Sequence, residues 1–211
     1  MPLEADLRLL EDLRDGHESA FIRLIEAYQT SMIRVAMLYV PTRVLAEEAV
    51  QETWIGVLKG MRRFEGRSSL KTWIFSILMN QAKTIGQREG RYQPIEWEEE
   101  GDPEPSVPAD RFHGVDGPYP DHWTTAGWPD SWETIPEETM LSKETRRYIQ
   151  QAIDALSESQ RIVITLRDVE MLTSEEVCNI LRISETNQRV LLHRARSKVR
   201  QTLETYLSEQ Y

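Results

Sequence analysis

Helical periodicity fills both ends of this 211-residue chain and stops between about residues 94 and 141. Eight of the ten prolines and four of the ten glycines lie in this middle segment. Proline lacks the backbone N–H that helices and sheets need, and glycine is costly to order, so regular structure is not expected there. We therefore expect two small helical domains, residues 1–95 and 142–211, joined by a long linker at 96–141.

The linker also carries the acidity of the chain. Residues 96–141 contain 13 Asp and Glu against one Arg, a net charge of −12, whereas residues 1–95 and 142–211 each have a net charge of +1. The total charge of −10 therefore does not argue against a nucleic-acid partner. Four tryptophans in the linker are unusual for a disordered segment, which leaves two alternatives, a solvated spacer or an ordered docking segment.

Four helices are predicted in the N-terminal part. Apolar residues recur at helical spacing over residues 3–13, with Gly16 beyond them, and over residues 21–39, where Pro41 stops the pattern. A third helix follows Pro41 and ends before Gly66, a plausible C-terminal glycine. Its predicted inward face is Ala46, Val50, Thr53, Trp54, Val57, Leu58, Met61 and Phe64.

A fourth helix is predicted to begin at a serine. The hydroxyl of Ser68 or Ser69 can accept a hydrogen bond from an otherwise unpaired N–H of the first turn. The inward face of this helix is predicted to be Leu70, Trp73, Ile74, Ile77, Leu78 and Ile85. No alternating strand pattern occurs in the chain, so the predicted class is all-α.

The C-terminal part begins with two further helices. One covers residues 149–156, and the next follows a capping box at residues 157–160, with Val163, Leu166 and Val169 inward. Thr173 and Glu176 form another capping box, before a short helix in which Cys178 is expected to be a small buried hydrophobe.

After a tight turn, Ser184 is predicted to cap a last helix with an apolar stripe and a basic outer face. A helix, a short turn and a basic second helix are typical of a helix-turn-helix, whose second helix enters the DNA major groove. The alternative is an amphipathic hairpin with a solvated basic face. The apolar stripe is Leu192, Ala195, Val199 and Leu203, and the cations are Arg189, Arg194, Arg196, Lys198 and Arg200.

Two segments of the N-terminal part resemble the sigma-70 family of bacterial transcription initiation factors, in its extracytoplasmic-function (ECF) group. Residues 45–54 (LAEEAVQETW) look like the polymerase-binding helix of that group. Residues 64–80, which begin FEGRSSLKTWIF, resemble its promoter-melting segment.

The C-terminal part adds two more segments in the order that the family has them. Residues 155–161 and 183–196 look like the second DNA-reading domain. The resemblance covers about residues 20–95 and 142–207, but not the long linker. Gln188 also departs from the family pattern, in which many members have a Val-like residue, so the start of the last helix is expected to pack differently.

The resemblance implies a transcription initiation factor. Such a protein binds bacterial core RNA polymerase and directs it to promoters. The N-terminal domain would read and melt a −10-type element, and the helix-turn-helix would read a −35-type element. The implied partners are core polymerase and promoter DNA, as duplex and as melted strand, with an anti-sigma factor as a further candidate. No cofactor is implied.

The melting segment combines cations with aromatic rings, as single-strand binding proteins do. Arg62, Arg67 and Lys71 are candidate phosphate contacts, together with Arg63. Trp73 and Phe75 are candidate platforms for unstacked bases, although the spacing of Trp73 suits a core position equally well. Asn80 is a candidate base contact or an exposed amide.

Two further sets of site residues follow from the resemblance. The polymerase-binding face is expected to include Glu47, Glu48, Gln51 and Glu52, although a Glu cluster on a helix is usually just solvated. In the helix-turn-helix, the front of the second helix is expected to read bases, and the cations after it are expected to meet phosphates. The front residues are Glu185, Thr186, Arg189 and His193, and the cations are Arg194, Arg196, Lys198 and Arg200.

The linker has two possible uses in such a factor. Its acids could imitate nucleic acid inside a polymerase channel, with tryptophans as docking anchors, or they could repel DNA from the tether.

Other classes of protein find less support in the sequence. An enzyme is not expected, since no phosphate-binding Gly-rich loop, paired His motif or nucleophile–base pair is present. Cys178 is the one cysteine and His193 has no ligand-spaced neighbour, so no metal site is expected. No secretory signal or membrane-spanning run is visible, which indicates a cytoplasmic location. The nearest rival is a stand-alone helix-turn-helix regulator, which would not need the segment at residues 64–80.

Overall fold

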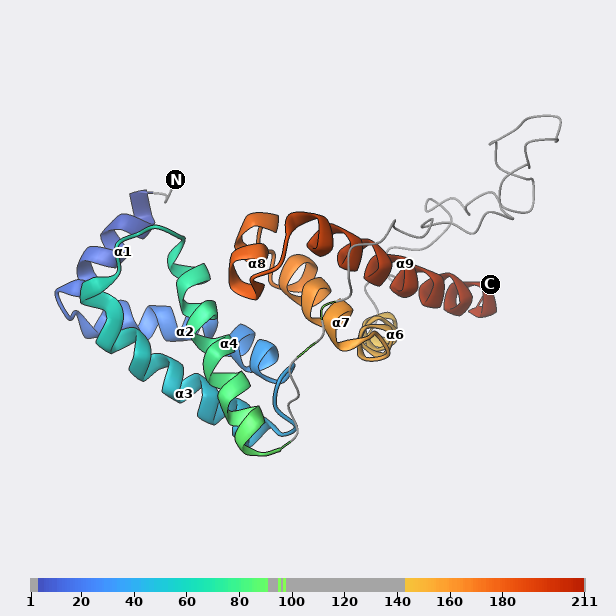
Figure 1. Cartoon of the computed structure of the whole chain (residues 1–211), viewed down its shortest axis with the longest axis horizontal. Helices are drawn as coiled ribbons and strands as arrows, with labels where there is room; N and C mark the ends of the chain where they lie inside the picture. The colour runs from blue at the N-terminus through green and yellow to red at the C-terminus, as the bar shows by residue number, and fades with distance from the viewer. Residues whose placement is uncertain (1–3, 91–94, 96, 98–142, 211) are drawn as a thin grey trace. The chain divides into compact units, whose positions relative to one another are not determined.

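The computed structural model describes residues 4–90, 95, 97 and 143–210. Every regular element among these residues is a helix, so the predicted all-α class is confirmed (Figure 1). Apart from Trp97, the predicted linker at 96–141 lies outside the described residues, and its alternative roles stay predictions.

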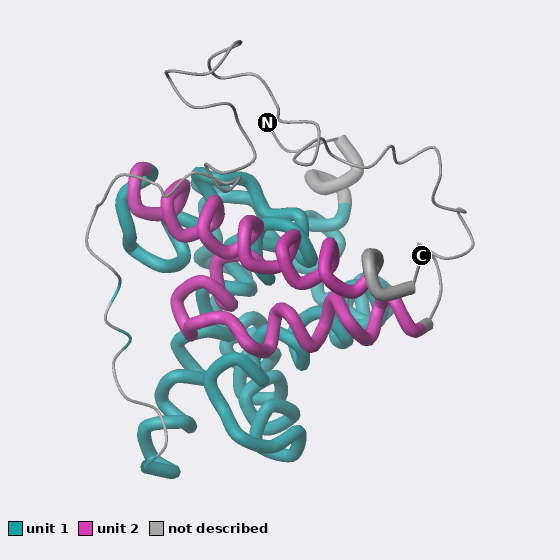
Figure 2. Tube along the Cα trace, turned by 90° about the vertical axis from the view of Figure 1, so that its right-hand side faces the viewer, with its two compact units in different colours: residues 1–97, 165–185 teal, residues 98–164, 186–211 magenta. Residues whose placement is uncertain are grey.

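The chain forms two compact units (Figure 2). Unit 1 comprises residues 1–97 and 165–185, and unit 2 comprises residues 98–164 and 186–211. Residues 165–185 group with the N-terminal helices because they pack on one of them. The predicted domain limits at 95 and 142 rest on sequence pattern alone and stay a prediction.

Four α-helices build the N-terminal part of unit 1. They are α1 (Glu4–Arg14), α2 (Glu18–Ala36), α3 (Arg43–Gly60) and α4 (Leu70–Arg88). Helices α3 and α4 pack against each other, and α2 contacts both. Their shared core is fully buried and mostly aliphatic, which suits close helix packing. It includes Leu24, Met32, Val35, Ala46, Val50, Val57, Ile74, Phe75 and Leu78.

Local capping explains where α3 and α4 begin. The hydroxyl of Thr42 accepts a hydrogen bond from the N–H of Leu45 at 3.4 Å. The hydroxyl of Ser69 accepts one from the N–H of Thr72 at 3.1 Å, which confirms Ser69 as the predicted cap of α4.

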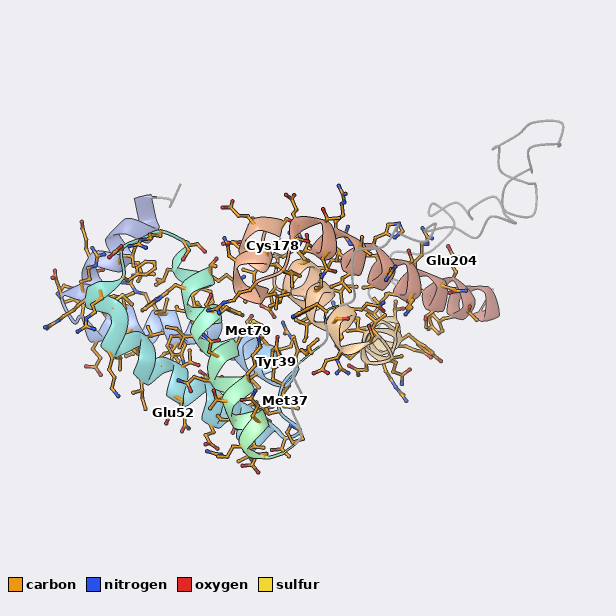
Figure 3. All side chains as sticks on the ribbon, in the orientation of Figure 1. Met37, Tyr39, Glu52, Met79, Cys178 and Glu204 are labelled. Carbon is orange, nitrogen blue, oxygen red and sulfur yellow. The ribbon has the colours of Figure 1, made fainter. Side chains whose placement is uncertain are left out.

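Helix α2 ends earlier than its apolar pattern predicted. Its last residue is Ala36, and the N–H groups of Leu38 and Tyr39 donate to the carbonyls of Val35 and Ala36 in a tight turn. The turn buries Tyr39 and leaves Met37 exposed (Figure 3). The prediction that Pro41 stops this helix was therefore wrong.

Helix α3 differs from its prediction in two places. Leu58, predicted to point inward, is 57% exposed. The helix ends at Gly60 and continues as a 3-10 turn, η1 (Met61–Arg63), so Gly66 lies in the following loop and does not end the helix. Gly66 instead has a φ of +71°, which favours glycine at that point of the loop.

The C-terminal part of unit 1 is a π-helical turn, η4 (Thr165–Val169), followed by α8 (Ser174–Leu181). The N–H of Glu170 donates to the carbonyl of Thr165 at 2.9 Å, five residues back. Such a wide turn rotates later side chains, and Val169, predicted to be inward, is 39% exposed. The capping box of Thr173 and Glu176 is confirmed.

Unit 2 contains α6 (Lys143–Asp154), α7 (Glu158–Ile164) and all but the first residue of α9 (Glu185–Gln210). Helices α7 and α9 begin directly after Ser157 and Ser184, as the sequence predicts. The rings of Tyr148 and Tyr206 stack with their centroids 3.8 Å apart. The buried core includes Ala152, Ile153, Leu156, Ile162, Val163, Leu191, Leu192 and Ala195.

Candidate nucleic-acid interface

The loop before α4 presents three arginines to solvent. Arg62 and Arg63 lie in the turn η1 and Arg67 follows it, and all three are exposed. Arg67 pairs with Glu65. The guanidinium of Arg14 donates to the carbonyl of Phe64 at 2.6 Å and fixes this loop to α1. The predicted cations Arg62 and Arg67 thus lie on one anchored loop.

Trp73 has features of both roles predicted for it, a core position and a platform for unstacked bases. Its ring packs against Phe64, with centroids 4.7 Å apart, and a Cβ added at Gly60 would lie 2.9 Å from its Cζ2 atom. Gly60 therefore leaves room for the indole, yet Trp73 stays half-buried. The ring is packed against Phe64 and Gly60, and the residue as a whole keeps some exposed surface.

Phe75 does not take the role that was expected of it. Its side chain is completely buried, and its ring meets that of Tyr28 edge to face at 6.3 Å. A ring in this position belongs to the core and cannot stack on an unpaired base.

The other two candidates on α4 differ from each other. Asn80 is exposed, as either of its predicted roles requires. Lys71 is half-buried, and its ammonium donates to the main-chain carbonyl of Glu170 at 2.5 Å. In this conformation Lys71 is therefore engaged within the protein.

The acidic and amide residues predicted on the third helix lie on the outer side of α3. Glu47 accepts from Arg43 at 2.8 Å, and Glu48 accepts from Arg88 at 3.1 Å. Gln51 and Glu52 are exposed, and Glu52 is labelled in Figure 3.

The structure adds apolar residues to this face. Val44, Ile55 and Leu58 are 73%, 42% and 57% exposed. With Glu48 and Gln51 they recur at i, i+4, i+7, i+11 and i+14, a straight line along one helix face. The sequence has the same spacing, but its apolar pattern predicts Leu58 on the inward face, and the structure contradicts that prediction.

The predicted DNA contacts on α9 differ in their exposure to solvent. Exposed residues are Glu185, Thr186, Arg189, Arg196 and Lys198, whereas His193 and Arg194 are half-buried. The ammonium of Lys198 donates to the side-chain oxygen of Gln160 at 3.0 Å. Gln188, the departure noted in the sequence, is 2% exposed, so an amide occupies a core position near the start of this helix.

No cluster of three His, Cys, Asp or Glu side chains among the described residues is arranged to hold a metal ion. No described helix is long and apolar enough to cross a membrane. Burial raises the pKa of the Cys178 thiol, and the half-buried side chain behaves as a small hydrophobe.

Known protein families match both helical parts of the chain. The model of sigma-70 region 2 matches residues 24–91, and that of sigma-70 region 4 matches residues 146–199. The chain belongs to the sigma-70 family. Its relatives place it in the ECF group of sigma factors.

Two curated relatives span almost the whole sigma factor. The ECF RNA polymerase sigma-E factor of Escherichia coli K12 is 28% identical over 92% of this chain and 92% of its own length. The RNA polymerase sigma-H factor of Pseudomonas aeruginosa is 27% identical over 98% of this chain and 97% of its own.

Solved structures show the same fold. CnrH, in complex with the cytosolic domain of CnrY, matches with a TM-score of 0.57 and 15% identity over 96% of this chain and 99% of its own. The sigma factor RpoE of Bartonella quintana, in complex with the anti-sigma factor NepR, matches with a TM-score of 0.54 and 19% identity over 87% and 96%. The predicted pair of helical sigma regions is thereby confirmed.

Within the sigma factor, region 2 contains both candidate surfaces of the N-terminal part. The match at 24–91 includes the outer face of α3 and the arginine loop with α4. The match at 146–199 includes α8 and the basic part of α9. Which of these side chains contact a partner stays a prediction.

Proposed function

We propose that this sigma factor binds bacterial core RNA polymerase and directs it to promoters whose −10-type element it melts and whose −35-type element it reads. The observation that carries the proposal is the presence of region 2 and region 4 on one chain, which a relative named as a sigma factor matches over 92% of its own length. A stand-alone helix-turn-helix regulator is not favoured, because it needs no region 2.

The outer face of α3 is the proposed polymerase-docking surface. The line of Val44, Ile55 and Leu58 offers apolar area that is costly to leave in water, and burial against a partner removes that cost. Glu48 and Gln51 lie in the same line, Glu47 and Glu52 lie next to them on α3, and all four can supply polar contacts. A mixture of exposed apolar and polar side chains on one face is compatible with a protein interface.

The arginine loop and α4 are the proposed surface for the melted strand. Arg62 and Arg67 are placed to follow phosphates, and the accessible part of Trp73 is placed to stack on a base. Asn80 extends this surface along the helix. Lys71 joins it only when its bond to Glu170 is broken.

The front of α9 is the proposed duplex-reading surface. Glu185, Thr186, Arg189 and His193 belong to its first turns, where a recognition helix contacts bases. Arg194, Arg196 and Lys198 follow and are assigned to phosphates, which position the helix without specifying sequence. This division supports the −35-type role of the C-terminal domain.

The proposal also includes the linker at residues 96–141, between an N-terminal domain at 1–95 and a C-terminal domain at 142–211. Residues 96–141 carry a net charge of −12, which suits a channel built for nucleic acid better than a passive tether. Replacement of this segment by a neutral Gly/Ser linker of equal length should preserve polymerase binding and change initiation yield and abortive transcripts. Identical transcription from both proteins would reduce the segment to a spacer.

The proposed function consists of binding and contains no catalytic step. Its place is the cytoplasm, where core polymerase acts. An anti-sigma factor belongs to the proposal as a further partner, since the similar RpoE structure contains one.

The direct test is whether promoter recognition depends on polymerase. Tagged chain should co-purify with core polymerase, and duplex promoter fragments should be retained specifically only when core polymerase is present. Specific, polymerase-independent binding to a palindromic operator would favour the regulator instead.

A further inference from the structure

The first helix of the chain lies outside the part that matches sigma-70 region 2. The match begins at residue 24, whereas α1 covers Glu4–Arg14 and packs against both α2 and the turn η1. Leu10 and Leu13 on α1 are buried, so this helix is packed on the rest of unit 1. The match to region 2 therefore gives no role to a helix that contacts the candidate melting surface.

The end of α1 is fixed to the start of α2. The N–H of His17 donates to the carbonyl of Asp12 at 2.9 Å, and Gly16 between the two helices has a φ of +79°, which favours glycine. The carboxylate of Asp12 also lies 3.3 Å from the imidazole of His17 and 3.5 Å from the guanidinium of Arg23. Arg14, the last residue of α1, thus belongs to a segment whose backbone is held in place.

Arg14 contacts the arginine loop, which runs from η1 to the start of α4. Its guanidinium donates to the main-chain carbonyl of Phe64 at 2.6 Å, across 50 residues of sequence. Phe64 is the residue at which η1 ends, and its backbone is extended. A carbonyl between two helices has no place in a helical hydrogen-bond ladder, so a side chain or water must satisfy it. A charged donor makes such a bond stronger than a neutral donor does.

Phe64 connects this bond to the rest of the melting surface. Its ring is buried and packs against Trp73 on α4, with centroids 4.7 Å apart. Arg62 and Arg63 precede Phe64, and Arg67 follows it by three residues. A shift of the Phe64 backbone would therefore move the arginines and the contact with the indole together.

We propose that Arg14 is a positioning residue for capture of the melted strand. Its bond to Phe64 keeps the arginine loop in the shape that the strand binds, so less conformational freedom is lost when phosphates meet Arg62 and Arg67. The proposal rests on the assignment of this loop to strand capture. Arg14 acts through the loop and does not itself touch DNA.

Two variants separate the bond from the charge. Arg14→Met removes the donor to Phe64 and keeps an unbranched apolar stem. Arg23→Met is the matched control, because it removes an exposed arginine from neighbouring α2 and leaves the bond to Phe64 in place. The pair of Arg23 with Asp12 is exposed, and such pairs contribute little to stability.

Hydrogen exchange of the full-length chain tests the positioning directly. In Arg14→Met, the backbone N–H groups of residues 62–68 should exchange faster than in the unchanged chain and in Arg23→Met, while those of α3 should keep their rates. Faster exchange throughout α3 would indicate general destabilisation, and unchanged exchange in the loop would show that the bond does not order it. Either result would overturn the proposal.

The effect on DNA is tested with holoenzyme and a fluorescent oligonucleotide, the non-template strand of the −10 region of a promoter that the holoenzyme transcribes. Arg14→Met should bind it about tenfold more weakly than Arg23→Met, with unchanged association of sigma factor and core polymerase. The dependence of affinity on salt should keep its slope, because a positioning residue releases no counterion. Equal affinity of the two variants, or a slope reduced by about one phosphate contact, would contradict the positioning role.

A further variant separates failure of this proposal from failure of the proposed function. In a chain with Arg62→Ala and Arg67→Ala, strand affinity should already be low, and Arg14→Met should reduce it little further. An undiminished loss from Arg14→Met in that background would rule out action through the loop. Normal strand affinity after Arg62→Ala and Arg67→Ala would instead overturn the assignment of the loop to strand capture, and the proposal with it, even if Arg14→Met changes hydrogen exchange.

Discussion

The guanidinium of Arg88 lies 3.1 Å from the carboxylate of Glu48 and ties the end of α4 to the outer face of α3. The hydrogen bond to Glu48 raises the pKa of Arg88. Part of the acidity of this face is therefore balanced inside region 2. We infer that the apolar line along α3, rather than its acids, contributes most to docking.

Leu58→Asp should weaken the association of this sigma factor with core polymerase by about tenfold or more, or roughly 1.4 kcal/mol or more. Leu58 is 57% exposed, so the change should leave folding nearly unaffected. A fluorescence titration of labelled sigma factor with core polymerase measures the dissociation constant.

The matched control for Leu58 is Ile22→Asp on α2, where the isoleucine is 48% exposed and lies outside the proposed face. If both variants lost affinity equally, the loss would come from adding a negative charge anywhere on the surface and not from a docking contact on α3.

Asn80→Ala should reduce opening of the promoter without weakening polymerase binding. Asn80 is exposed, and the contact we assign to it forms only when a base leaves the duplex. Permanganate reactivity of unpaired thymines reports the open complex. Gln87→Ala changes an exposed amide seven residues along the same helix face, and normal opening in both variants would remove Asn80 from the melting surface.

Arg189→Ala should cost about 1–3 kcal/mol at one promoter position, because a bidentate contact to a base edge discriminates between bases. Arg200→Ala should weaken binding to all sequences alike and reduce the salt dependence by about one phosphate contact. Holoenzyme affinities for a set of single-base promoter variants separate the two. Uniform loss for Arg189→Ala would make it a phosphate contact.

Glu176 should make the stability of unit 1 depend on acidity. Burial raises its pKa, but hydrogen bonds from Thr72, Ser69 and Thr173 outweigh burial and lower the pKa from 4.5 to about 2, so the unfolded chain binds the proton more readily. The stabilisation is therefore complete above pH 4.5 and is lost as the pH falls toward 2. Urea unfolding across this range should show a steeper loss for the unchanged chain than for Glu176→Gln.

The neighbour Glu175 provides the control for this pH dependence. It is exposed on the same turn of α8, so Glu175→Gln should leave the pH profile as it was. A profile that is unchanged by Glu176→Gln would show that the contact with Ser69 and Thr72 does not stabilise the fold.

Local signals predicted much of this fold. The Thr173–Glu176 capping box and the cap at Ser69 involve residues three apart, so spacing alone identifies them. The C-terminal end of α2 and the direction of Val169 were predicted wrongly. A tight turn after Ala36 and a π-helical turn at residues 165–169 change the helical phase without a proline or glycine to mark them.

The candidate site was predicted less completely, for a related reason. Val57 and Leu58 are adjacent apolar residues on α3, and only packing decides that Val57 is buried while Leu58 is exposed. On α4, likewise, only packing decides that Phe75 is buried while Trp73 is half-buried. The contacts of Glu176 with Ser69 and Thr72 span more than 100 residues of sequence, and no local pattern indicates them.

Run-off transcription with purified core polymerase tests the central claim most directly. With this sigma factor added, core polymerase should yield discrete transcripts from a limited set of fragments of the source genome. Leu58→Asp and Asn80→Ala should reduce them, and Ile22→Asp and Gln87→Ala should not. Absence of promoter-specific transcripts from a holoenzyme that forms normally would contradict the account.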